Sequence, residues 1–283
     1  MAIDIHVHPN FFEDIQDEER SFEFLQNSKE IFNNSTSSIS HIRNQMKCAK
    51  LDKLVLLGQD ERSIYGMPVV CNDDIAKLVT MYPEDFYGFA SIDPSYPGAL
   101  DELKRSIIDL RLHGLKLDLA KLGMYPNDLR VHAIYEFCEE KSIPILFHSG
   151  MSWQRQTEMH YGHPMNFEWV AIHYPELRFC LGHFGFPWVK ETACLLIKHK
   201  NVYADTAALY FDSAYEFFDY LFKSEIPLTW LDRSLWKKVI FGSNQPRFEQ
   251  IRMANALRNL PLHPNTIERI MHINALEFLG VIK

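Results

Sequence analysis

The sequence predicts an α/β protein that folds as one (β/α)8 TIM barrel domain over residues 1–283. Short apolar segments alternate with longer helix-like segments along the chain, which is typical of repeated strand–helix units. A chain of 283 residues with 47% hydrophobic residues is close in length to the roughly 250 residues of such barrels. No low-complexity linker interrupts this pattern, so we place no domain boundary inside the chain.

The first four strand–helix units occupy the N-terminal half of the chain. We expect their strands at residues 3–7, 53–57, 86–90 and 115–117. The helices that follow are expected at residues 38–50, 72–81, 97–110 and 129–141. Asn72 suits the N-cap of its helix, and Pro97 suits the first turn of the next one. Residues 11–36 are polar and irregular, which predicts a long loop after the first strand.

The second half of the chain repeats the same rhythm. Its strands are expected at residues 145–147, 178–181, 202–204 and 238–241. Its helices are expected at residues 166–174, 189–198, 211–223, 248–259 and 265–279. Eight strands result, each followed by a helix, as the barrel requires.

Composition excludes several classes of function. The net charge of −8 and the lack of a basic run disfavour a nucleic-acid partner. The five cysteines are odd in number and scattered, which favours a reducing cytosol over a disulfide framework. No signal peptide and no apolar run of about 18 residues is present, which predicts a cytoplasmic protein without membrane contact.

Polar residues follow the predicted strands at the point where each strand ends. The carboxyl-terminal end of the strands is where the active sites of such barrels lie, so polar residues there indicate chemistry. Histidine is the commonest metal ligand and the usual acid–base residue near neutral pH, and the chain has thirteen. The residues in question are His6, His8, His148, His183, Asp205 and Asn244.

His6 and His8 form an H-x-H pair at the exit of the first strand. Side chains alternate along a strand, so both imidazoles share one face and can reach the same metal ion. The motif is weak by itself, because two partly buried polar residues give the same pattern. Its position beside His148 at another strand end favours a shared metal site.

At this point the sequence resembles the amidohydrolase superfamily, and more narrowly the amidohydrolase-2 (aminocarboxymuconate semialdehyde decarboxylase-like) group. The resemblance implies a TIM barrel of the metal-dependent hydrolase type. The matching segments run in order over nearly the whole chain: residues 3–8 (IDIHVH), 72–76 (NDDIA), 88–94 (GFASIDP), 114–117 (GLKL), 146–150 (LFHSG), 181–185 (LGHFG), 241–246 (FGSNQP) and 274–275 (NA).

The resemblance also implies roles for individual residues. It makes His6, His8 and His148 metal ligands, and His183 the catalytic or substrate-polarising residue, which in some members is a ligand of a second metal. After the eighth strand the group normally has an aspartate that binds the metal and moves protons, and here that position is Asn244. We keep Asn244 as a candidate ligand and catalytic residue.

Asn244 departs from the pattern in a way that matters chemically. Its amide offers a neutral oxygen and cannot act as a base near pH 7. Three interpretations follow: an engineered Asp→Asn change that holds substrate unreacted, a natural enzyme that uses His183 as its base, or an inactive relative. A three-histidine zinc site still lowers the pKa of its water to about 7, so hydrolysis is compatible with Asn244.

Imidazole-rich ligation without thiolates predicts one divalent metal, with zinc first and manganese, iron or nickel as alternatives. Lys116 ends the fourth strand, where some superfamily members carboxylate a lysine to bridge two metals. Its alternative role is to neutralise acidic neighbours or bind a substrate carboxylate, and we favour a single metal. Asp205 either anchors His183 or caps the following helix.

The loops above the barrel suit a small-molecule substrate. In residues 151–163, Trp153 is suited to stack on a planar group and Arg155 to clamp a carboxylate, as is Arg247 after the eighth strand. For each of them the alternative is packing on its neighbours. We expect a small organic acid, ester, lactone or amide as substrate.

The primary hypothesis is therefore a metal-dependent hydrolase that uses a metal-activated water. The alternative is non-oxidative decarboxylation of an aromatic or enoic acid, and a rival of another class is a non-catalytic binding protein, motivated by Asn244. A nuclease fits poorly because the net charge is negative. Aromatic residues on the helix at 211–223 are candidates for a homo-oligomer interface or for packing on the barrel wall: Phe211, Tyr215, Phe217, Phe218 and Tyr220.

Overall fold

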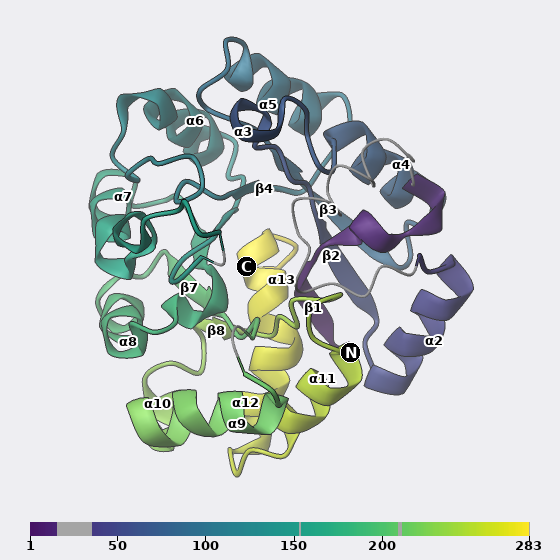
Figure 1. The fold of residues 1–283 in the computed structure, drawn as a ribbon. Coiled ribbons are helices and arrows are strands. Elements are labelled where there is room, and N and C mark those ends of the chain that lie inside the picture. The colour runs from purple at the N-terminus through teal and green to yellow at the C-terminus, as the bar shows by residue number, and fades with distance from the viewer. Residues whose placement is uncertain (16–35, 153, 209–210, 283) are drawn as a thin grey trace.

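Eight parallel strands form one sheet in the order β1 to β8, and helices surround it (Figure 1). The structure is a computed structural model of the 283-residue chain and describes residues 1–15, 36–152, 154–208 and 211–282. The strands are β1 (Ile3–Val7), β2 (Lys53–Leu57), β3 (Phe86–Ser91), β4 (Gly114–Leu117), β5 (Ile145–Phe147), β6 (Phe179–Leu181), β7 (Val202–Asp205) and β8 (Val239–Ile240). All eight predicted strands are confirmed, with ends that differ by at most one residue.

The helices are α2 (Ile39–Ala49), α3 (Arg62–Tyr65), α4 (Asn72–Met81), α5 (Ala99–Ile108), α6 (Leu129–Glu140), α7 (Glu168–His173), α8 (Val189–Lys198), α9 (Ala214–Asp219), α10 (Leu228–Arg233), α11 (Gln250–Arg258), α12 (Pro264–Glu268) and α13 (Asn274–Leu279). A π-helical turn, Tyr220–Glu225, extends α9, and another, Arg269–Ile273, joins α12 to α13. The sequence patterns did not predict α3 and α10. Most of the predicted loop at 11–36 lies outside the described residues.

Hydrogen bonds between β1 and the segment that follows β8 close the barrel. The amide of Ile5 donates to the carbonyl of Phe241 at 3.0 Å, and that of His8 donates to Gln245 at 2.8 Å. The amide of Asn244 donates in the other direction, to the carbonyl of His6 at 3.0 Å. The segments that carry the predicted site residues of β1 and β8 are thereby fixed side by side.

One extra residue in β1 controls which way its side chains point. Asp4 pairs with Leu54 and Val7 with Leu56, so β1 advances three residues while β2 advances two, which is a β-bulge. Ile5 packs inside the barrel, whereas Val7 packs in the outer layer against the helices. His6 and His8, on either side of Val7, therefore face the carboxyl-terminal end of the barrel.

The opposite end of the barrel is closed by α13. Asn274 donates from Nδ2 to the carbonyl of Trp236, which precedes β8, at 2.8 Å and to that of Val239, the first residue of β8, at 2.7 Å. Phe278 reaches the barrel interior, with its ring centroid 6.3 Å from that of Phe89. Figure 1 shows α13 lying across the barrel centre. Because apolar side chains fill this end, chemistry is confined to the other one.

Asn72 does not cap α4, contrary to the prediction. Cys71 is the N-cap residue and Asn72 is the first helical residue. The amide of Asn72 instead pairs with both backbone groups of Ser91 at the end of β3, at 2.8 and 3.0 Å, and donates to Glu102 at 2.7 Å. A buried amide gains more by satisfying three partners than by bonding one helix-end amide.

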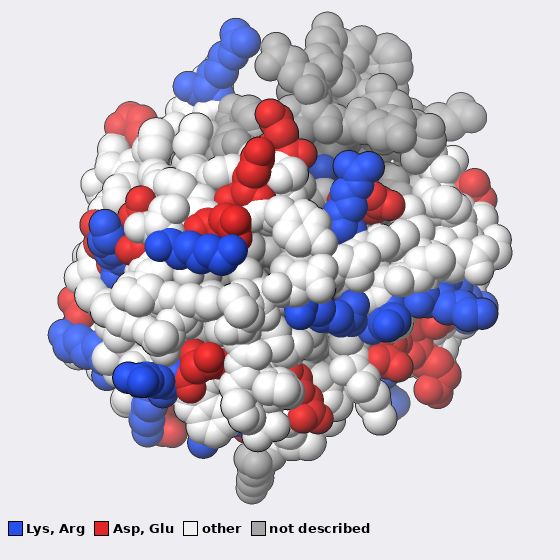
Figure 2. Space-filling view, turned by 90° about the horizontal axis from the view of Figure 1, so that it is seen from below, with Lys and Arg blue, Asp and Glu red and all other residues white. Residues whose placement is uncertain are grey.

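The aromatic residues at the start of α9 divide between core and surface. Phe217 and Phe218 are fully buried in the main core, whereas Tyr215 is about half exposed and its hydroxyl accepts from Asn259. On the face seen in Figure 2, acidic and basic side chains of the described residues are interspersed rather than gathered by sign. Within the described part of the chain, no helix combines the length and apolar character needed to cross a membrane.

Asp4 ties β1 to the segment after β8. Its buried carboxylate accepts from the amide and hydroxyl of Ser243 at 2.9 and 2.5 Å, from Gln250 Nε2 at 3.0 Å and from the amide of His6 at 3.1 Å. Burial raises the pKa of Asp4 to about 6, although these hydrogen bonds oppose the shift. The strand that carries the histidine pair is therefore held by a titratable group.

We predict that Asp4 makes stability depend on pH. Because its pKa is raised in the folded protein, its contribution to stability is complete below the ordinary value of 3.8 and is lost as pH rises through 6. Urea denaturation of Asp4→Asn and wild type between pH 4 and 7 checks this: wild type should lose stability relative to the variant as pH rises. Parallel curves would contradict the prediction, and Asp109→Asn, at an exposed carboxylate, is the control.

Candidate metal centre

The predicted site residues meet at the carboxyl-terminal end of the barrel. His6 lies within β1, and His8 and His148 come directly after β1 and β5. His183 follows β6, and Asp205 is the last residue of β7. Residues up to 199 positions apart in the sequence are thus neighbours in space.

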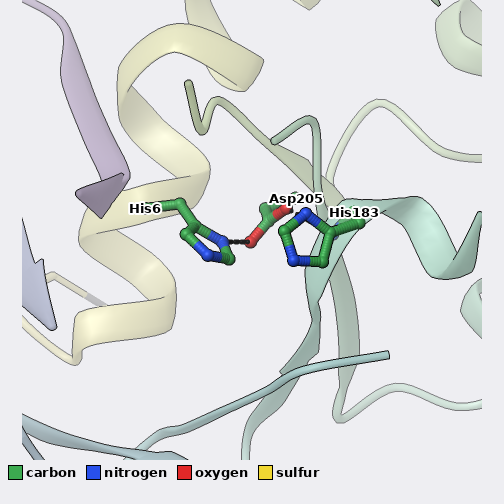
Figure 3. Close-up of side chains that lie close together, drawn as sticks. All are labelled: His6, His183 and Asp205. Carbon is green, nitrogen blue, oxygen red and sulfur yellow. Dashed lines mark hydrogen bonds and ion pairs between the residues drawn. The ribbon is translucent and has the colours of Figure 1, made fainter. Parts of the chain in front are cut away.

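Asp205 joins three strands through its carboxylate. Oδ2 accepts from His6 Nδ1 at 2.7 Å, while Oδ1 accepts from the amides of His183 at 2.7 Å and Ala207 at 3.0 Å (Figure 3). The sequence left open whether Asp205 anchors His183 or caps a helix. The structure shows that it anchors the His6 ring and the His183 backbone, and α9 begins only at Ala214.

The hydrogen bond to Asp205 fixes the tautomer of His6. A carboxylate oxygen at 2.7 Å accepts a hydrogen bond, so Nδ1 of His6 carries the proton. Nε2 then has the lone pair, and it is buried without a hydrogen-bond partner among the described residues. A buried nitrogen of this kind is expected to have a ligand in the working protein.

His183 is held in the same tautomer by a different partner. Its Nδ1 lies 3.0 Å from the carbonyl oxygen of Ala207, which can only accept, so Nδ1 is the protonated nitrogen. The backbone of His183 is left-handed, with φ of 59°, a conformation that costs on the order of 1 kcal/mol or more for such a residue. The hydrogen bond from the His183 amide to Asp205 helps to hold it there.

The other two histidines extend the group on either side. The ring centroids of His8 and His6 are 5.2 Å apart, those of His6 and His183 are 4.7 Å apart, and those of His183 and His148 are 4.9 Å apart. His148 Nε2 lies 3.2 Å from the carbonyl of Met151, which makes it the donor and leaves Nδ1 with the lone pair. The four imidazoles form a continuous cluster.

Burial keeps these imidazoles neutral. It lowers the pKa of all four histidines, and nearby Lys116 lowers each pKa further, while Asp118 opposes the shift at His148. A histidine must be neutral to coordinate a metal ion. Near neutral pH the cluster therefore presents lone pairs rather than charges.

These residues fit a divalent metal ion. Ligand atoms of His6, His183 and Asp205 lie within 4.8 Å of one another. Because both Asp205 oxygens already accept strong hydrogen bonds, we assign Asp205 to orienting His6 and not to direct coordination. The predicted ligand roles of His6, His8 and His148 stay predictions, and the structure places His183 beside His6 and Asp205 in the group whose ligand atoms lie close together.

Asn244 is held in one orientation. Its backbone is left-handed, with φ of 69°, and its side chain is 4% exposed. Nδ2 donates to the carbonyl oxygen of Ala208 at 2.9 Å, so Oδ1 is the amide atom left to face another group. A neutral oxygen is the only atom that this side chain has to offer a metal ion.

A second polar group lies beside the histidines, and sequence reasoning found only one of its members. Lys116 is buried without a hydrogen-bond partner among the described residues, and burial lowers its pKa to about 8. Lys121 lies 3.4 Å from both Glu61 and Asp118, and the pKa of Asp118 falls to about 2 because nearby His148 and the lysines outweigh its burial. The sequence Lys-Leu-Asp at the end of β4 was the available signal.

Two of the predicted substrate-binding residues, Arg155 and Arg247, lie on loops of the described part of the chain. Trp153 falls outside the described residues. Arg155 is exposed on the loop after β5, and Arg247 is half buried with its guanidinium carbon 5.9 Å from the centroid of the Phe248 ring. Their part in substrate binding stays a prediction.

The fold and the site together define a class of protein: TIM barrels with a buried histidine cluster at the carboxyl-terminal end of the strands. Residues 59–281 match the model of the amidohydrolase family, and the chain belongs to that family. This confirms the resemblance seen in the sequence motifs. Enzymes of this family generally depend on a divalent metal. No curated protein matches the sequence.

Solved structures share the fold at low sequence identity. An uncharacterized TIM-barrel protein from Bordetella bronchiseptica is 20% identical, with a TM-score of 0.78 over 99% of this chain and 98% of its own. A dihydroxybenzoic acid decarboxylase from a Polaromonas species, with bound manganese and the inhibitor 2-nitroresorcinol, is 14% identical, with a TM-score of 0.71 over 99% and 97%. A 5-carboxyvanillate decarboxylase from Sphingomonas paucimobilis is 15% identical, with a TM-score of 0.67 over 99% and 98%.

We predict that Asp205→Asn weakens metal binding without unfolding the protein. The negative charge of Asp205 orients His6 and makes its Nε2 more basic, and the substitution removes this charge. Changes of this kind lower metal affinity by about 10- to 100-fold. Competition with a chromophoric chelator, using zinc and manganese separately, measures the effect. Equal affinities for wild type and variant would contradict the assignment, and Asp109→Asn again serves as the charge-matched control.

Proposed function

We propose that this chain is a metal-dependent hydrolase of small organic acids, esters, lactones or amides, with His183 as the residue that accepts a proton from water. The observation that carries the proposal is the tautomer of His183. Its Nδ1 proton is committed to Ala207, so Nε2 is an unprotonated base inside the histidine cluster. A general base needs this state before the reaction begins.

The surroundings of His183 support the proton transfer. Burial and the neighbouring histidines lower its pKa, which keeps Nε2 free at the start. Asp205, whose Oδ1 accepts from the His183 amide, opposes this shift and stabilises the imidazolium once it forms. The bond to Ala207 prevents the ring from turning during the transfer.

A bound divalent cation would supply Lewis-acid polarisation of the substrate carbonyl and make water more acidic. Zinc is our first choice because the donors are imidazoles, and manganese is an alternative because a decarboxylase with this fold holds it. His6, His8 and His148 would hold the ion, with Asn244 Oδ1 as a neutral fourth donor. None of these residues needs to lose a proton to do so at neutral pH.

The position of Asn244 supports His183 as the base. Because the Ala208 carbonyl accepts a hydrogen bond from Nδ2 at 2.9 Å, the protein provides a place for an N–H group there. A carboxylate oxygen in the same place would face another oxygen. The amide therefore fits its surroundings as a natural residue of a working site, which favours this interpretation over an engineered change or an inactive relative.

We predict that Asn244→Asp does not raise activity. Repulsion between the new carboxylate and the Ala208 carbonyl should lower the free energy of unfolding by about 1–3 kcal/mol, and turnover should fall. Urea denaturation and initial rates on the same preparation measure both effects. An Asn244→Asp variant that is stable and faster than wild type would show that the side chain at position 244 is the proton acceptor.

We predict that His183→Gln lowers kcat by about 10²- to 10⁴-fold, the usual contribution of a general base. Metal content should remain close to that of wild type if His183 acts on the proton and not as an essential ligand. Elemental analysis and pH-indicator assays on a panel of esters and lactones measure the two quantities. Loss of metal together with activity would instead make His183 a ligand.

Decarboxylation is the second candidate, and two observations favour it. Four of the solved structures that share this fold are decarboxylases of hydroxylated aromatic acids. The buried Lys116 ammonium also lies near the histidines and can donate a proton. Hydroxybenzoates in the same assay panel, followed by carbon dioxide release, separate the two reactions, and a protein that binds these acids without turning them over would be a binding protein.

A further inference from the structure

Lys116 extends from β4 toward the histidine cluster. Leu115 and Leu117, its neighbours along the strand, pack in the outer layer with the helices, so Lys116 faces the barrel interior. It pairs in register with Ser91 on β3 and Leu146 on β5. Its charge lowers the pKa of His6 and His183, so the ammonium acts electrostatically on these imidazoles.

Every carboxylate near Lys116 has another partner. Glu61 and Asp118 each lie 3.4 Å from Lys121. Asp205 is occupied by His6 and by two backbone amides. Lys116 is 6% exposed, and its Nζ has no hydrogen-bond partner among the described residues.

An unpaired buried ammonium is costly, because the charge has lost its hydration without gaining a partner. Lys121, on the same side of the barrel, shows how this chain satisfies a buried lysine when the lysine is structural: it provides two carboxylates. In the described part of the chain, no carboxylate forms a hydrogen bond or ion pair with Lys116. The missing partner is therefore expected to come from outside the protein.

We propose that the Lys116 ammonium receives a carboxylate group of the substrate. The proposal rests on the proposed function in so far as the same histidines perform the reaction, and it narrows the substrate class to small carboxylates, as opposed to neutral esters or amides. A carboxylate is the anion that matches a single ammonium and is neutralised by it. The bound substrate would then lie between Lys116 and the imidazole cluster.

Binding of benzoate and of neutral benzamide tests this proposal on the full chain, by calorimetry with and without zinc. Lys116→Met should weaken benzoate binding about tenfold or more, the value of one hydrogen bond to a charged group, and leave benzamide unchanged. Lys116→Gln is the second variant. Lys47→Met, at an exposed lysine on α2, is the control for net charge and should bind benzoate as wild type does.

Thermal unfolding gives an independent readout, because an unpaired buried lysine that serves ligand binding lowers the stability of the ligand-free protein. Lys116→Met should raise Tm by removing an unpaired buried charge. Lys121→Met should lower it, because Glu61 and Asp118 would lose their cation. A fall in Tm for Lys116→Met would show a structural lysine and overturn the proposal.

Other results would overturn the proposal in distinct ways. Benzoate affinity that is unchanged in Lys116→Met, or no benzoate binding to wild type, would rule out a carboxylate site at Lys116. If inorganic phosphate binds more tightly than benzoate and depends on Lys116 in the same way, the ligand group is a phosphate and not a carboxylate. A carbamate resonance in protein equilibrated with ¹³C-bicarbonate, absent from Lys116→Met, would show a carboxylated lysine. Benzoate binding through Lys116 without any turnover would contradict the proposed function alone.

Discussion

The carboxylate of Asp205 is the interaction on which the candidate site depends. It accepts hydrogen bonds from the His6 ring, the His183 amide and the Ala207 amide, and so connects β1, β6 and β7 at one end of the barrel. Because it is fully buried, each of these bonds is strong and costly to break. This one side chain orients His6 and helps to hold the left-handed backbone of His183.

The rest of the fold brings these groups to Asp205 and holds them there. The bulge in β1 turns His6 and His8 toward the carboxyl-terminal end while Ile5 still fills the interior. Asp4 fastens the same strand to Ser243, and Asn244 bonds to the carbonyl of His6. With α13 filling the opposite end, the imidazoles occupy the one end of the barrel that is available for chemistry.

Much of this arrangement could be predicted from the sequence, because strand ends in a barrel converge at one place. The eight strands, and the placement of His6, His148 and His183 beside one another, needed only hydrophobic alternation and position. The partner of Asp205 could not be predicted in the same way, since sequence spacing does not show which of several buried donors lies nearest across the barrel. Asn72 was misassigned for a related reason. Its amide suits an N-cap locally, but it instead forms hydrogen bonds with the backbone of Ser91, at a strand end 19 residues away.

The central claim is that His6 and His183 are both neutral, with the proton on Nδ1 and the lone pair on Nε2. Long-range ¹H–¹⁵N NMR of metal-free protein at pH 7, assigned with His6→Gln and His183→Gln, observes this directly. We predict that Nδ1 is the protonated nitrogen in both rings and that the Nε2 resonance of His6 shifts when zinc is added. A proton on Nε2 of either ring, or two imidazolium rings, would contradict the account.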